Sequence, residues 1–124
     1  MASIDRPLGG DAMLFRLSDS ERSELIDEQL LAERKRTART LVKEGALRVT
    51  LVALAPGGAL QEHHAEGPIT VHVLAGEIRF RAGGNEWILR QGDLLSVPAR
   101  VPHAVESDNG GQFLLTMAVP PPAA

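Results

Sequence analysis

In the stretch Gly92-DLLSV-Pro98-A-Arg100-VP-His103-AVE-Ser107, a glycine turn, two prolines and a histidine follow one another at fixed intervals. On both sides of this stretch, hydrophobic and polar residues alternate with a period of two. The alternating runs are residues 48–54, 69–73, 78–82 and 113–117. Alternation of this kind is typical of β-strands that bury one face. The surroundings of the stretch therefore predict a sheet.

Turn signals rich in Gly, Pro, Asn and Asp separate these runs at intervals of roughly 8–12 residues, the spacing of an all-β sandwich or barrel. They are Glu44-Gly45, Pro56-Gly57-Gly58, Glu66-Gly67-Pro68, Ala75-Gly76, Gly83-Gly84-Asn85, Gln91-Gly92-Asp93 and Asp108-Asn109-Gly110-Gly111. This punctuation predicts about eight short strands. Because only ~80 residues are available for them, a small jelly-roll barrel is favoured.

The amino-acid composition limits which kinds of site and partner the chain can have. The chain has 124 residues, 44% of them hydrophobic, which suits one globular domain. It has no cysteine, which excludes disulfides, thiolate metal sites and a Cys nucleophile. With 13 basic and 16 acidic side chains it has no basic excess, so neither nucleic acid nor a membrane is expected as a partner. No apolar run has the length of a signal peptide or a membrane span, and we expect a cytoplasmic protein.

The first 36 residues differ from the rest. Ser18 and Glu21 have capping-box spacing, and Leu25, Ile26 and Leu30 fall on one face of a short amphipathic helix predicted from Asp19 to about Arg36. The basic residues at 34–36 are interpreted as a solvated face that nearby acids neutralise. We expect an N-terminal helical arm over 1–36, a barrel over 37–119 and a disordered tail over 120–124.

The opening stretch resembles the second half-motif of the cupin family, in which Gly, Pro, Gly, His and Asn follow at these intervals. It departs at Arg100, where cupins have Gly, and at Ser107, where they have Asn. The first half-motif is matched in spacing by Gly57-GALQE-His63-H-Ala65-EGP-Ile69-TVHVLA-Gly76, with Ala65 and Ile69 replacing a His and a Glu. The resemblance implies an all-β fold, the cupin double-stranded β-helix or jelly-roll barrel.

In metal-binding cupins, three histidines and one glutamate hold a divalent ion inside the barrel. Carried over position by position, the resemblance leaves only His63 and His103 as ligands. Two protein ligands hold a metal weakly, so a divalent cofactor (Zn, Ni, Mn or Fe) is expected to bind weakly or not at all. A β-bulge would instead bring Glu62 and His64 into register, which makes His64 a further candidate ligand.

Three other polar residues are expected to lie outside the ligand set. His72 is expected to point out of the barrel, because Ile69, Val71 and Val73 form the inward set. Glu66 is expected to be solvated at the barrel mouth, and Arg100 to be an exposed charge beside it. Trp87 is expected to pack in the core. The remaining inward set is apolar, which predicts a compact apolar pocket. Its other members are Val49, Leu51, Ile78, Phe80 and one face of residues 113–119.

These patterns predict a small-molecule-binding cupin whose pocket contains His63 and His103. The alternative is a metal-dependent cupin enzyme of the oxygenase or isomerase type, with His64 or Glu62 as a third ligand. A third hypothesis is a regulatory module that uses the basic helix. A homodimer is expected from the habit of the family and from the arm, whose Leu and Ile residues need a surface to cover.

Overall fold

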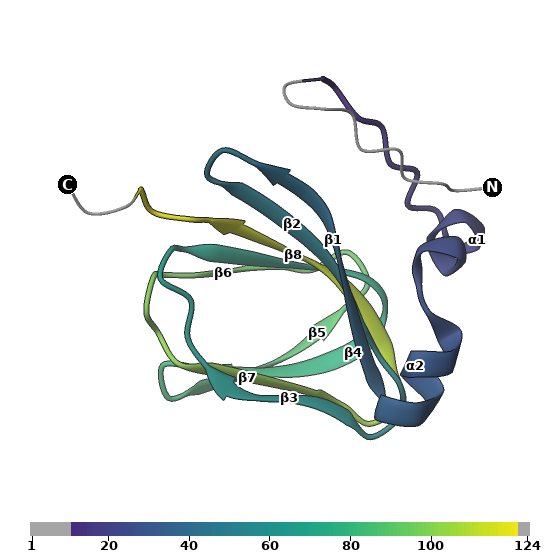
Figure 1. The fold of residues 1–124 in the computed structure, drawn as a ribbon. Helices are drawn as coiled ribbons and strands as arrows, with labels where there is room; N and C mark the ends of the chain where they lie inside the picture. The colour runs from purple at the N-terminus through teal and green to yellow at the C-terminus, as the bar shows by residue number, and fades with distance from the viewer. Residues whose placement is uncertain (1–10, 122–124) are drawn as a thin grey trace.

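The computed structural model describes residues 11–121, and Figure 1 shows their arrangement. Predictions for residues 1–10 and 122–124, including the expected disorder of the last three residues, lie outside this range. The elements are α1 (Asp19–Arg22), the 3-10 helix η1 (Ser23–Leu25), α2 (Glu28–Arg34), β1 (Arg36–Glu44), β2 (Leu47–Leu54), β3 (Gly58–His63), β4 (Ile69–Ala82), β5 (Asn85–Arg90), β6 (Leu94–Val97), β7 (His103–Ser107) and β8 (Gly111–Ala118). The prediction of about eight strands in an all-β barrel with a short N-terminal helical region is confirmed.

All strand pairs in the barrel are antiparallel, and β4 holds it together. The strand order is β1-β2-β8-β4-β7-β3, with β5 and β6 also paired to β4. The first half of β4 pairs with β8 and β6, and its second half pairs with β7 and β5. A single strand therefore belongs to both walls of the curled sheet (Figure 1).

The predicted turn at Ala75-Gly76 is wrong, because β4 runs through it. The register with β8 shifts between Val73 and Ala75, and Gly76 adopts a φ of 71°. A Cβ at Gly76 would lie 2.3 Å from the carbonyl oxygen of Gly110. Here the glycine serves a bulge that bends the strand from one wall to the other.

The barrel interior is an apolar cluster of buried residues: Val52, Leu54, Ile69, Val71, Val73, Ile78, Phe80, Ala82, Leu89, Val97, Val105 and Phe113. The predicted inward residues of β4 are in it. The inward assignment of Val49 and Leu51 is wrong, because Val52 and Leu54 face the barrel and Leu51 packs in a second cluster outside it. Trp87 is also not a core residue, since 36% of it is exposed.

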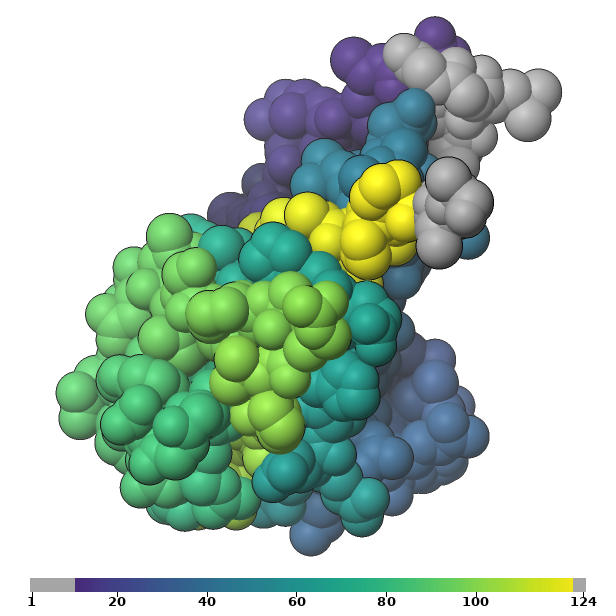
Figure 2. Space-filling view, turned by 90° about the vertical axis from the view of Figure 1, so that its left-hand side faces the viewer, coloured from purple at the N-terminus to yellow at the C-terminus, as the bar shows by residue number. Residues whose placement is uncertain are grey.

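The second cluster joins the N-terminal arm to the outer face of the sheet. Leu25 and Ile26 are buried there against Leu41, Leu51 and Ala53. The arm thus covers its own barrel with the apolar residues that were expected to need a partner surface. In Figure 2 the purple segments of the arm lie at the top of the molecule and the green segments at the lower left.

The predicted single helix over the arm is broken into short pieces. Ile26 is extended (φ −108°, ψ 126°), and the Asp27 side chain then caps α2 by accepting a 3.0 Å hydrogen bond from the Leu30 amide. The Ser18 hydroxyl donates to the Glu21 carboxylate and does not cap the backbone. The break lets both Leu25 and Ile26 reach the sheet.

Candidate functional site

His103 opens β7 and is the buried member of the site, with only 4% of it exposed. Its Nδ1 donates to the Val101 carbonyl oxygen at 3.0 Å, and its ring stacks on Phe80 with centroids 5.6 Å apart. Burial lowers the pKa of His103 below its ordinary value of 6.5, against the opposing effect of the Val101 bond. The ring is thus held in a fixed orientation and favoured in its neutral form.

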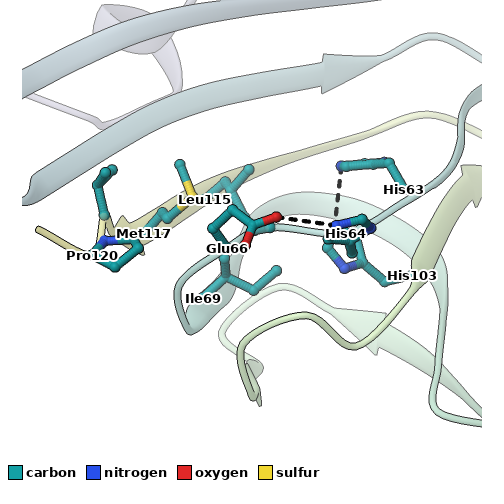
Figure 3. A pocket seen from close by; sticks show the side chains of 10 residues that line it. His63, His64, Glu66, Ile69, His103, Leu115, Met117 and Pro120 are labelled. Atoms are coloured by element: carbon teal, nitrogen blue, oxygen red, sulfur yellow. Dashed lines mark hydrogen bonds and ion pairs between the residues drawn. The ribbon is translucent and has the colours of Figure 1, made fainter. Parts of the chain in front are cut away.

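His63 is the last residue of β3 and lies opposite His103 in the strand register. Its side chain is exposed, and its Nδ1 contacts the Gln61 carbonyl oxygen at 2.8 Å. The two Nε2 atoms are 3.2 Å apart and the rings meet edge to face, with centroids 4.4 Å apart (Figure 3). The strand pairing thus brings together the two histidines that are predicted to form the site.

The tautomers of this pair follow from the carbonyl contacts. A carbonyl oxygen only accepts, so each Nδ1 carries the proton and each neutral ring leaves a bare Nε2 lone pair. Two lone pairs that face each other at 3.2 Å repel, unless a proton on one ring or a cation lies between them. Two imidazole nitrogens on one tetrahedral zinc ion lie about 3.3 Å apart. The pair therefore fits two ligand positions of a divalent metal.

A cavity of about 360 Å³ opens beside the pair, between the barrel mouth and the end of β8. Its lining residues are His63, His64, Ala65, Glu66, Ile69, His103, Leu115, Met117, Val119 and Pro120. In Figure 3 the imidazoles lie at one end of this group and the Met117 and Pro120 side chains at the other. The cavity is thus polar at one end and apolar at the other.

His64 follows β3 and lies on the rim of the same cavity, where its Nε2 contacts the Glu66 carboxylate at 3.2 Å. Both side chains are more than half exposed. Glu62 is exposed on β3 and does not line the cavity. Within residues 11–121, no group of three or more His, Asp or Glu side chains is arranged to hold a metal. His63 and His103 are therefore the pair that the fold brings together, with the other candidates at the rim.

His72 faces away from the barrel interior, since its neighbours Val71 and Val73 are both buried inside. It lines a separate outer groove together with Arg22 of the arm. Arg100 is exposed and has a φ of 64°, and its amide donates to the Ala65 carbonyl oxygen at 2.7 Å. The backbone of Arg100 thus ties together the two loops that border the mouth.

The inward face predicted for residues 113–119 supplies Leu115 and Met117, which form the apolar wall of the cavity. Two other features of the site were not predicted from the sequence. Phe80 was expected to be inward, but not as the ring beneath His103. Ser107, in place of the motif asparagine, is buried and donates to the Glu77 carbonyl oxygen at 2.6 Å. This hydrogen bond links β7 to β4.

Comparison with known proteins supports the motif assignment. The family model described as "Cupin domain" matches residues 50–119, more than half of the chain. No curated protein matches the sequence significantly. None of the helices in residues 11–121 is long and apolar enough to span a bilayer.

Three solved structures illustrate the likeness. A cupin 2 conserved barrel domain protein from Leptotrichia buccalis is 30% identical (TM-score 0.70), over 79% of this chain and 46% of that one. A conserved protein of unknown function from Streptococcus pyogenes is 21% identical (TM-score 0.67) over 98% of both chains. Salicylate 1,2-dioxygenase from Pseudoaminobacter salicylatoxidans is 19% identical (TM-score 0.71), over 78% of this chain and 31% of that one. This chain thus spans under half of the first of these proteins and about a third of the last.

Proposed function

The chain belongs to the cupin domain family, and from that premise we propose that it binds a small organic molecule in the barrel mouth. The ligand lies with an apolar group on the β8 wall and an oxygen-bearing group at His63 and His103. A divalent metal binds weakly to the same two imidazoles. The observation that carries this proposal is the facing Nε2 pair at one end of an apolar cavity.

The cavity sets the size and polarity of the ligand. About 360 Å³ is at the low end of the range for small-molecule sites, which suits a single ring or a short chain. Ile69, Leu115 and Met117 offer only apolar contact, so the polar group of the ligand is directed toward the histidines. Glu66 at the rim disfavours a second negative charge on the exposed side.

His63 and His103 would hold the metal, and a bound divalent ion would supply Lewis-acid polarisation of a ligand oxygen. The chain itself supplies one fixed and one exposed imidazole. Val101 and Phe80 hold the His103 ring in place, and Gln61 fixes the proton of His63 on Nδ1. Because the chain offers two ligands where catalytic sites generally offer three, weak binding is expected.

A thermal-shift titration with C4–C8 monocarboxylates and the matching alcohols, with and without zinc, tests the ligand class. We expect the carboxylates to raise the melting temperature more than the alcohols, and zinc to enhance the difference. Met117→Glu places a charge on the apolar wall and should abolish the response, whereas Leu94→Glu, on an exposed β6 residue outside the cavity, should preserve it. Equal responses in the two variants would contradict this site.

A second candidate is a metal-dependent enzyme of the oxygenase or isomerase type, favoured by the two bare Nε2 atoms at the edge of a cavity large enough for a substrate. The likeness to a dioxygenase lies at 19% identity and concerns the fold. Elemental analysis of tag-free protein separates the two candidates. About one metal per chain would favour the enzyme, and clearly less than one would favour the binding protein.

A further inference from the structure

The curled sheet has a seam where its two edge strands meet. β1 and β3 are the first and last strands in the order of the sheet, and within residues 11–121 no backbone ladder joins them. The two strands nevertheless contact each other, and α2 packs beside the start of β1 (Figure 1). Edge strands carry backbone N–H and C=O groups that their own sheet leaves unpaired. The seam is therefore a place where the fold leaves polar groups available.

A second cavity, of about 250 Å³, opens at this seam. Its lining residues come from α2, β1 and β3: Leu30, Arg34, Arg36, Thr37, Ala38 and Leu60. None of them lines the cavity at the two histidines. Leucine and alanine side chains supply its apolar part, and two guanidinium groups supply positive charge with no carboxylate among the lining residues. The seam cavity is thus both apolar and cationic.

The charge of these two arginines is not used within the chain. Four other arginines lie in ion pairs with carboxylates: Arg22, Arg79, Arg81 and Arg90. Among the ion pairs of residues 11–121, none includes Arg34 or Arg36. Arg36 donates to the Ala59 carbonyl oxygen at 3.4 Å, which is long for an N–H···O hydrogen bond. The nearby acids that were expected to neutralise the basic run therefore make no direct contact with these two groups.

The turn between the two arginines is fixed by backbone hydrogen bonds. Lys35 adopts a left-handed conformation (φ 63°, ψ 9°), which is uncommon for a residue other than glycine. Its amide donates to the Leu31 carbonyl oxygen at 2.8 Å, and its carbonyl oxygen accepts from the Ala55 amide at 3.0 Å. The helix dipole favours a cation at the end of α2, which accounts for Arg34 but not for Arg36 on β1. The backbone that carries both arginines is thus in place before a ligand binds.

We propose that the seam cavity binds a small organic anion, a carboxylate or phosphate monoester that carries a short apolar group. The guanidinium groups of Arg34 and Arg36 hold the anionic head, since their planar forks match the oxygens of carboxylates and phosphates. The apolar group lies on Leu30 and Leu60. This site is separate from the histidine cavity and does not depend on the function proposed for it.

The size of the cavity favours a small molecule over a polyanion. A volume of about 250 Å³ lies just below the usual range of ligand pockets, which suits a short chain attached to one anionic group. A nucleic acid or an anionic membrane would need a wider basic surface, and the chain as a whole carries a formal charge of −3. The apolar walls would also give a polyanion no added contact.

Calorimetric titration of the full chain at low salt, with butyl phosphate, pentanoate and butanol as probes, tests the proposal. We expect both anions to bind and butanol not to bind, because the alcohol has no charge for the arginines. Inorganic phosphate should bind more weakly than butyl phosphate, because it leaves the apolar walls uncovered. The tighter of the two organic anions identifies the preferred head group.

Substitutions at the seam locate the bound anion. Arg34→Gln and Arg36→Gln should each raise the dissociation constant of butyl phosphate at least about tenfold, because each removes hydrogen bonds to a charged group. Arg39→Gln makes the same change at an exposed β1 residue outside the cavity and should have little effect. Ala38→Glu places a carboxylate beside the arginines and should abolish binding, whereas the neutral Ala38→Gln should retain it.

Three results would overturn the proposal. Equal effects of Arg36→Gln and Arg39→Gln would show a response to net charge alone. Binding of butyl phosphate that Met117→Glu abolishes would place the ligand in the histidine cavity. A wild-type chain that binds neither organic anion at low salt would also contradict the site, whatever the histidine cavity binds.

Discussion

The two histidines of the site belong to opposite kinds of environment. His103 lies on β7, an interior strand paired on both sides, and is held by Val101 and Phe80. His63 lies at the end of β3, an edge strand, with an exposed side chain whose Nδ1 contacts the Gln61 carbonyl. The barrel thus presents one preorganised imidazole and one adjustable imidazole to the same cavity. The weak metal binding that we propose follows from having two protein ligands, and the exposed, adjustable His63 weakens it further.

The largest expected effect follows from removing the support of the fixed imidazole. Phe80→Ala deletes a buried ring beneath His103 and should lower the free energy of unfolding by about 3–5 kcal/mol. Urea denaturation measures it. Ile88→Ala, at an exposed position on the adjoining strand, should change stability by less than about 0.5 kcal/mol. A small effect of Phe80→Ala would mean that the His103 side is no better packed than the His63 side.

Truncation of the histidines themselves should reproduce the asymmetry. His103→Ala loses a buried hydrogen bond and a ring stack, and should cost about 1–3 kcal/mol. His63→Ala removes an exposed side chain and should cost under about 0.5 kcal/mol. Chemical denaturation of the two variants in metal-free buffer measures both. Equal losses would contradict the asymmetry.

The pH dependence of stability should come from the buried histidine. Because burial lowers the pKa of His103 in the folded chain, the unfolded chain binds the proton more readily. The contribution of neutral His103 to stability is fully present above pH 6.5, the ordinary pKa of histidine. It is lost as the pH falls through the lower pKa that His103 has in the folded chain. Thermal melts between pH 5 and 8 should show this loss for wild type and His63→Ala, and His103→Ala should show less of it. An unchanged pH profile in His103→Ala would mean that another group causes the pH dependence of stability.

The smallest effect concerns the loop that borders the mouth. Arg100 adopts a left-handed φ of 64° where the family motif has glycine, and side chains other than glycine are strained there. Arg100→Gly should raise the free energy of unfolding by about 0.5–1 kcal/mol, since glycine's extra freedom in the unfolded chain offsets part of the gain. Arg100→Ala provides the control, because it keeps the strain and removes the charge. If both variants gain equally, the charge is the cause.

His103, the fixed imidazole, was also the easier of the two histidines to predict from the sequence. The second half-motif keeps all its intervals, and the position of His103 follows from it. The first half-motif has lost two ligand positions, so spacing alone could not decide whether His63 or His64 faces the site. Only the observed pairing of His63 with His103 selects between their registers.

The errors of sequence prediction have physical causes. In β2 residues 51–54 are all buried, because the barrel covers one face and the arm covers the other. Alternation cannot identify the inward face of a strand that is buried on both sides, which is why Leu51 was misplaced. The pattern at Gly76 predicts a turn wrongly, because a glycine bulge and a glycine turn have the same local signature.

The central claim is that His63 and His103 together form a weak metal site, and a zinc titration followed by thermal unfolding tests it most directly. At tenfold excess over the dissociation constant, zinc should stabilise the wild-type chain by about 1.4 kcal/mol, visible as a rise of a few degrees in the melting temperature. His63→Ala and His103→Ala should each abolish the rise, whereas His72→Ala, on the outer face, should retain it. A rise that survives both site substitutions, or no rise in the wild-type chain at any zinc concentration, would contradict the claim.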